Sequence, residues 1–178
     1  MPGTETIEIE GLEILPDKWP AEVDLIISAL ARTDRRIRLI VAGEGPLRGQ
    51  LEEKAAAMGV ADRVTFTGKV SDEELVKRYA GAMAVVFPPF DEDYGYVTLE
   101  AFLARKPVIT TTDAGGPLEF VEDGVTGVVA EPTAESLGAA IARLASDPRR
   151  ARALGDAGFE RVRDISWDHV VDRLMADG

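Results

Sequence analysis

The sequence predicts an α/β fold, with a mostly parallel sheet of about six strands and helices on both faces. Short aliphatic or β-branched runs alternate along the chain with segments whose apolar residues recur every three or four positions. Strands and helices that alternate in this way form right-handed βαβ units, in which successive strands are parallel. The length of 178 residues and the absence of a glycine- and serine-rich linker predict one domain over residues 1–178.

The first half of the chain contains three strand–helix units. Apolar residues three and four apart predict the first helix, which Pro20 opens. Ser71, followed three residues later by Glu74, is a capping box that predicts the start of another helix. The elements expected in this half are, in order, strand Thr4–Ile9, helix Pro20–Arg32, strand Ile37–Ala42, helix Pro46–Met58, strand Arg63–Thr67 and a helix from Ser71 to about Gly81.

Proline and glycine signals divide the second half. Pro88 and Pro89 end a strand, and the turns at 115–117 and 123–127 separate the elements that follow. The elements expected here are strand Met83–Phe87, helix Tyr96–Ala104, strand Val108–Thr111, short helix Leu118–Val121, strand Val128–Ala130 and three closing helices near Ala134–Ala145, Pro148–Asp164 and Ser166–Met175.

Composition excludes several classes of function. The chain has no cysteine and one histidine, so disulfides, thiolate metal sites and multi-histidine metal sites are excluded, and we interpret His169 as structural. The formal net charge of −12 argues against nucleic acid or an anionic membrane surface as partner, because basic patches recognise both. The N-terminus has no signal-peptide pattern and no apolar run approaches the ~18 to 20 residues of a membrane span, so we expect a cytoplasmic protein.

Four loops follow the predicted strands and are candidates for a site. Ligands of open parallel sheets bind beyond the carboxyl ends of the strands. This rule selects Gly43–Pro46, Thr67–Ser71, Pro88–Glu100 and Thr111–Glu119. No GxGxxG fingerprint or GxxxxGK[ST] phosphate loop occurs, so dinucleotide-binding and P-loop interpretations are weak.

The third loop and the helix after it carry the most informative residues. Gly95 lets a ligand approach the backbone where a helix begins, and free helical amides suit a phosphate; alternatively, Gly95 only shapes a turn. Glu100 lies in an otherwise apolar helix, where an ionised carboxylate needs water, a partner or ligand hydroxyls. It therefore binds a ligand, faces water, or pairs with Lys69 or Lys106.

The remaining candidates each have two interpretations. Glu92 belongs to a run of three acids, which is either a solvated loop or a group near the reacting carbon of a ligand. Gly43 and the pair Gly115-Gly116 either allow close approach to a sugar or diphosphate or form tight turns. Lys18 either neutralises a diphosphate as a point charge or is a solvated lysine.

Six motifs stand in an order and spacing that resemble one known family. Glu92 and Glu100 are separated by seven residues with Tyr94-Gly95 between them, in the form E-x-[FY]-G-x-x-x-x-E-A. The other five are GEGP at 43–46, VTFTGKV at 64–70, KPVI at 106–109, GGxxE at 115–119 and DGxTG at 123–127. From about Lys18 to Trp167, the chain resembles the group 1 (family 4) retaining glycosyltransferases.

The resemblance implies one half of a GT-B fold, in which two Rossmann-like domains enclose the active site. It covers only the C-terminal domain, which binds a UDP-, GDP- or ADP-linked sugar, and the N-terminal acceptor domain has no counterpart here. It implies retaining hexosyl transfer without a required metal or other cofactor. We expect the isolated chain to be inactive without the second domain.

The resemblance also implies roles for individual residues. Glu100 would bind the ribose hydroxyls, and Glu92 would lie beside the donor sugar and orient or stabilise the reacting centre. Lys18 would stabilise the diphosphate leaving group. The rest of the implied donor site consists of the backbone amides of Gly95 and Tyr96 at the diphosphate, Lys69 and Val70 beside the base, and Val97, Gly43, Gly115 and Gly116.

One departure from the family pattern leaves other functions open. The family usually has an arginine six residues before the lysine, directly after a glycine, whereas here Gly11 is followed by Leu12. Half of a cationic clamp on phosphate is therefore missing, which predicts weakened donor binding. A non-catalytic nucleotide-sugar-binding module, a stable scaffold of the same fold, and half of a sugar-nucleotide epimerase are the alternatives.

Overall fold

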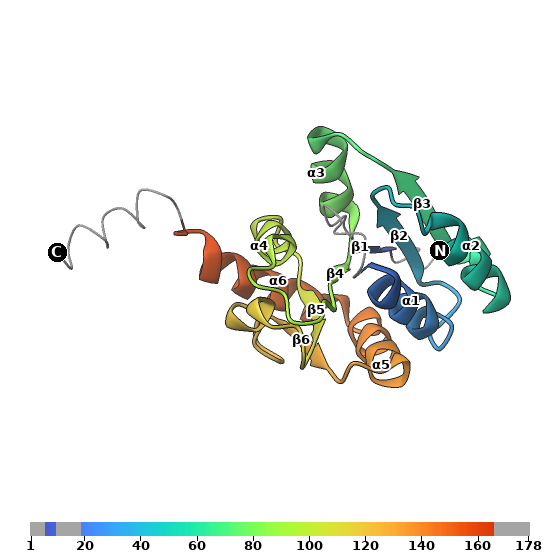
Figure 1. Ribbon diagram of the computed structural model, residues 1–178. Coiled ribbons are helices and arrows are strands. Elements are labelled where there is room, and N and C mark those ends of the chain that lie inside the picture. The colour runs from blue at the N-terminus through green and yellow to red at the C-terminus, as the bar shows by residue number, and fades with distance from the viewer. Residues whose placement is uncertain (1–5, 10–18, 166–178) are drawn as a thin grey trace.

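The described part of the chain, residues 6–9 and 19–165 of the computed structural model, is built around one parallel sheet (Figure 1). Its strands are β1 (Thr6–Ile9), β2 (Arg38–Ala42), β3 (Val64–Gly68), β4 (Ala84–Val86), β5 (Val108–Thr111) and β6 (Gly127–Ala130). Its helices are α1 (Trp19–Leu30), α2 (Arg48–Ala57), α3 (Asp72–Gly81), α4 (Tyr96–Leu103), α5 (Ala134–Ala145) and α6 (Pro148–Val162), with short 3-10 turns η1 (Ala61–Arg63) and η2 (Gly116–Glu119). The predicted Rossmann-like α/β class is confirmed.

Most element boundaries fall within two residues of those expected. The short helix expected at Leu118–Val121 is a 3-10 turn at Gly116–Glu119, two residues earlier, with Pro117 in its first positions. Predictions for Leu12, Lys18, His169 and a helix at Ser166–Met175 lie outside the described residues.

The strand order in the described residues is β3-β2-β1-β4-β5-β6, and every neighbouring pair is parallel. The chain therefore runs outward from β1 to β3 and then returns to β4, which lies on the other side of β1. This reversal is the topological switch point at which open α/β sheets bind ligands. The loop that follows β4 and leads into α4 begins at this point.

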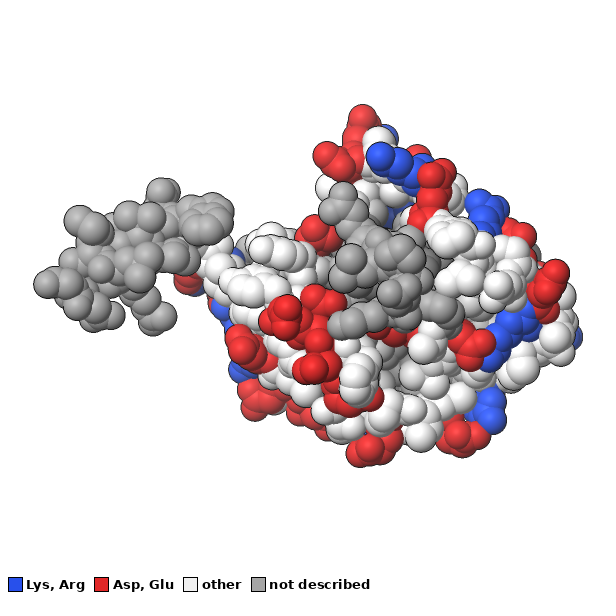
Figure 2. All heavy atoms as spheres, in the orientation of Figure 1, with Lys and Arg blue, Asp and Glu red and all other residues white. Residues whose placement is uncertain are grey.

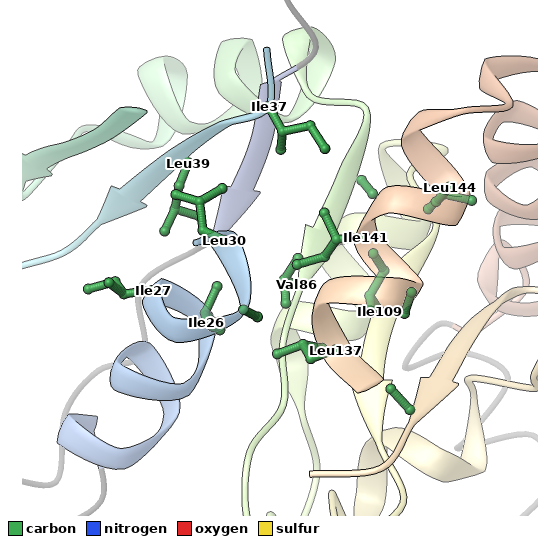
Figure 3. Packing of buried hydrophobic residues seen from close by; sticks show 14 of the residues in the cluster. Ile26, Ile27, Leu30, Ile37, Leu39, Val86, Ile109, Leu137, Ile141 and Leu144 are labelled. Atoms are coloured by element: carbon green, nitrogen blue, oxygen red, sulfur yellow. The ribbon is translucent and has the colours of Figure 1, made fainter. Parts of the chain in front are cut away.

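Apart from α6, each face of the sheet packs against its own set of helices. Along β4 the side chains alternate, so that Ala84 and Val86 belong to one buried cluster and Val85 and Phe87 to the other. The first cluster joins the sheet to α1, α2 and α5, and the second joins it to α3 and α4. Figure 3 shows the first cluster, where Ile26, Ile27 and Leu30 of α1 and Leu137, Ile141 and Leu144 of α5 face Leu39, Val86 and Ile109 of the strands.

Helix α6 contributes to both clusters. Ala151 and Leu154, in its first half, pack in the cluster under α1 and α5, whereas Val162 at its end packs in the cluster under α3 and α4. In Figure 1 this last described helix passes behind α4 at the edge of the sheet.

Side-chain caps fix several helix starts. Ser71 accepts a hydrogen bond from the backbone N–H of Glu74 at 3.3 Å, which confirms the predicted cap of α3. The carboxylate of Glu74 pairs with Arg78 one turn later, so it is engaged in an ion pair on the helix surface. None of the helices in the described residues is long and apolar enough to cross a membrane, and the location of the protein stays a prediction.

Candidate functional site

The loops after β4 and β5 are joined along their backbones. The N–H of Glu92 donates to the carbonyl oxygen of Ala114 at 3.0 Å, and the N–H of Gly116 donates to the carbonyl oxygen of Glu92 at 2.6 Å. Together these bonds form a parallel bridge between Glu92 and Gly115. The acidic run and the glycine pair, which the sequence offered as separate candidates, therefore form one structure at the carboxyl edge of the sheet.

Three glycines of this structure are required by its own packing. A Cβ on Gly115, whose φ is 75°, would lie 2.6 Å from the carbonyl oxygen of Glu92. A Cβ on Gly116 would overlap the backbone carbonyl of Asp93, and one on Gly95 would lie 2.7 Å from Cγ of Pro117. The close approach that the sequence suggested for a ligand occurs here between two protein loops. Ligand contacts of these glycines stay a prediction.

The start of the loop after β2 is joined by its backbone to the last residue of β3. The N–H of Gly43, at φ 136°, donates to the carbonyl oxygen of Gly68 at 3.0 Å, and the two residues form an antiparallel bridge. The four loops selected by sequence thus lie at one edge of the sheet, as predicted, and form two joined pairs. One pair lies on each side of the switch point.

The start of α4 presents backbone amides at this edge. Gly95 caps the helix in a left-handed conformation (φ 66°, ψ 53°), and its carbonyl oxygen accepts from the N–H of Thr98 at 2.9 Å. The first amides of a helix have no acceptor within the helix and carry partial positive charge. The side chain of Val97 is buried, so only its backbone can reach a ligand, whereas Tyr96 is exposed and its ring lies 5.0 Å from that of Tyr94.

Glu100 lies on the second turn of α4 and has a tyrosine as partner. The hydroxyl of Tyr79, on α3, donates to Oε2 of Glu100 at 3.1 Å. Glu100 is exposed as a residue, yet partial burial of its carboxylate raises its pKa, and the negative charge of Asp72 raises that pKa further. Lys106, one of the two lysines considered as partners, donates to the backbone carbonyl of Ala80 at 3.0 Å.

Tyr79 is the site residue that the sequence interpretation missed. It is four residues after Leu75 on α3 and contributes to the same apolar stripe, so the pattern indicates a core residue. The only signal was chemical, because a buried tyrosine hydroxyl needs a hydrogen-bond partner. The pattern does not reveal that this partner lies on another helix, 21 residues further along the chain.

Three other predicted residues lie in the segments that precede these two helices in the chain. Lys69 is exposed and Val70 half-buried in the short segment between β3 and α3, next to Asp72. Glu92 is half-buried in the joined loops before α4. Across the described residues, no group of three or more histidine, aspartate or glutamate side chains could hold a metal ion.

The surface gives no general attraction for an anion. Figure 2 shows acidic side chains spread over the visible face and basic ones in smaller groups, in keeping with the net charge of −12. An anionic ligand at the carboxyl edge would therefore depend on local donors such as the first amides of α4.

Comparison with known proteins gives a consistent set of relatives. The family described as "Glycosyl transferases group 1" matches residues 18–161. A D-inositol 3-phosphate glycosyltransferase from Segniliparus rotundus is 34% identical over 183 residues, which cover 98% of this chain and 40% of that protein. The chain therefore spans about 40% of the length of this relative.

Solved structures share the fold over almost the whole chain. Anabaena HepE, in complex with UDP and glucose, superposes with a TM-score of 0.81 at 22% identity, over 97% of this chain and 49% of HepE. The C-terminal domain of a group 1 family protein from Francisella tularensis superposes with a TM-score of 0.77 at 22% identity, over 93% of this chain and 87% of that domain. At such identities the likeness shows a common fold.

Proposed function

The chain belongs to the group 1 glycosyl transferases, and we propose that it is the part of such an enzyme that binds the nucleotide-diphosphate sugar. The position of the joined loops and of α4 supports this, because they lie at the carboxyl edge beside the switch point. The complex of HepE with UDP and glucose supports a nucleoside diphosphate as the ligand class.

The observation that carries the proposal is the state of Glu100. Its carboxylate is partly buried, which raises its pKa, and the partner that the structure shows for it is the neutral hydroxyl of Tyr79. A carboxylate kept for stability is usually paired with a cation. Glu100 retains acceptor capacity on both oxygens after that bond, which suits the two hydroxyls of a ribose.

The diphosphate would lie at the start of α4. The left-handed cap at Gly95 turns the chain so that the amides of Tyr96 and Val97 open the helix. Amides in this position bind phosphate well, since the helix dipole adds to their hydrogen bonds. Lys18 would supply a formal charge, and Leu12 in place of an arginine predicts weaker binding than in relatives that have both cations.

The reaction of the complete enzyme would be retaining transfer of a hexosyl group to an acceptor, without a metal. Glu92, tied by backbone bonds to the loop after β5, would lie beside the donor sugar and stabilise the reacting centre. Lys69 and Val70 would flank the base. The acceptor would be held by an N-terminal domain outside this chain, so the isolated chain would bind the donor without transferring the sugar.

Calorimetric titration of the 178-residue chain with UDP, GDP and ADP tests the proposal. One nucleotide should bind saturably, and Glu100→Gln should weaken its affinity by about 10- to 100-fold, the range for hydrogen bonds to a charged group. Glu53→Gln, at an exposed position of α2, makes the same charge change away from the site and should leave the affinity unchanged. If Glu100→Gln binds as well as the parent, the ribose assignment is wrong. If none of the three nucleotides binds at millimolar concentration, the isolated chain has the fold of its family without nucleotide binding, and the proposal is wrong.

A further inference from the structure

We propose that Tyr79 is a positioning residue of the nucleotide site, whose hydroxyl holds the Glu100 carboxylate in the orientation that receives the ribose hydroxyls. This inference rests on the proposed function of Glu100 and adds a second residue to that function.

The hydroxyl of Tyr79 is a donor whose position is set by the core. Tyr79 is 4% exposed, and its ring packs in the buried cluster that includes Phe87 and Phe102. A tyrosine side chain has few rotatable bonds, so the packed ring leaves its hydroxyl little freedom. Because a carboxylate only accepts hydrogen bonds, the direction of donation runs from Tyr79 to Oε2 of Glu100.

The backbone around Tyr79 is tied to the segment that follows α4. The N–H of Ala82 donates to the carbonyl oxygen of Arg78 at 2.9 Å, which closes the last turn of α3. Nζ of Lys106 donates to the carbonyl oxygen of Ala80 at 3.0 Å. The bond from Lys106 therefore ties the end of α3, which carries Tyr79, to the segment that follows α4, the helix that carries Glu100.

The hydrogen bond from Tyr79 restrains the side chain of Glu100, which would have more rotamers available without it. A glutamate that becomes ordered on ligand binding loses rotamer entropy, and this loss weakens the affinity. The bond from Tyr79 restrains the side chain before the ligand arrives and leaves Oε1 to accept from a ribose hydroxyl.

Tyr79→Phe removes the hydroxyl and keeps the ring. The experiment measures calorimetric affinities for whichever of UDP, GDP and ADP binds, and for the 2′,3′-dideoxy form of the same nucleotide. We expect Tyr79→Phe to weaken the ribonucleotide by about tenfold and the dideoxy form by little, so that discrimination between them falls. Val162→Ala, which removes side-chain volume from the same buried cluster on α6, should lower the unfolding temperature and leave the discrimination unchanged.

The outcomes separate this inference from the function on which it rests. If Tyr79→Phe discriminates as the parent does, Tyr79 has no positioning role and the donor-site proposal stands. If Val162→Ala loses discrimination to the same extent, the effect is general loosening of the core and the inference is overturned. If the parent itself does not distinguish the two nucleotides, or binds neither, the proposed role of Glu100 fails and the role of Tyr79 fails with it.

Discussion

The substitution Gly115→Ala should break the junction between the loops after β4 and β5. Gly115 has φ 75° and ψ −126°, a conformation that is strained for alanine by about 1–3 kcal/mol. The added Cβ would lie 2.6 Å from the carbonyl oxygen and 2.9 Å from the nitrogen of Glu92. These are backbone atoms, which cannot move away by rotating a side chain, so the loops must separate.

Separation also weakens the backbone bonds that join the loops. The bond from Glu92 to Ala114 and the bond from Gly116 to Glu92 are each worth about 0.5–1.5 kcal/mol net. Combined with the conformational strain, the expected loss in free energy of unfolding is about 2–6 kcal/mol. For a domain of this size that corresponds to a decrease of about 4–24 °C in Tm.

Urea and thermal unfolding, followed by circular dichroism, measure this loss. Gly49→Ala is the matched control, because Gly49 is exposed in α2 and nothing is within 4 Å of its added Cβ. That variant should be as stable as the parent or more stable by up to about 1 kcal/mol, since alanine favours helix. If Gly115→Ala unfolds within about 0.5 kcal/mol of the parent while the control behaves as expected, the argument from the tight junction is refuted.

Two further predictions concern the carboxylates. Because the pKa of Glu100 is raised in the folded protein, its carboxylate binds a proton more readily there than in the unfolded chain. Above that pKa the ionised carboxylate therefore lowers the free energy of unfolding. Protonation of Glu100 also removes acceptor capacity for the ribose hydroxyls. As the pH is lowered, nucleotide affinity should therefore begin to fall at a higher pH than it would for a glutamate with the usual pKa of about 4.3. The affinity-versus-pH profile of Glu100→Gln serves as the reference, because subtracting it removes the titration of the phosphates. If the affinities of the two proteins change with pH in parallel, the predicted role of Glu100 ionisation is contradicted. Glu100→Gln should also unfold at no lower temperature than the parent at pH 7. In an enzyme restored to two domains, Glu92→Ala should reduce turnover far more than nucleotide affinity, as measured by steady-state kinetics and titration, and equal losses would remove its assigned role.

The fold class could be predicted because it depends on local patterns. Apolar spacing located the helix that begins near Pro20, and Ser71 marked the cap of α3. Once strands alternate with helices, the strands must be parallel, and their carboxyl ends then share one edge. For this reason the four candidate loops could be placed together without knowledge of the strand order.

The contacts within the site could not be predicted in the same way. The bond between Tyr79 and Glu100 joins two helices whose relative rotation depends on how each packs on the sheet. Gly115 and Gly116 were recognised as positions without room for a side chain, but the group that takes up this space is the backbone after β4. Local sequence shows that another group must come close to the backbone of these glycines, but it does not identify that group.

Helix α6 has a consequence for the order in which the protein is made. Its first half completes the core on one face of the sheet with Ala151 and Leu154, and its end completes the core on the other face with Val162. During synthesis, both faces therefore retain uncovered apolar surface until the ribosome has released the chain to about residue 162. The nascent domain would therefore gain stability on both faces together, when this one helix emerges and packs.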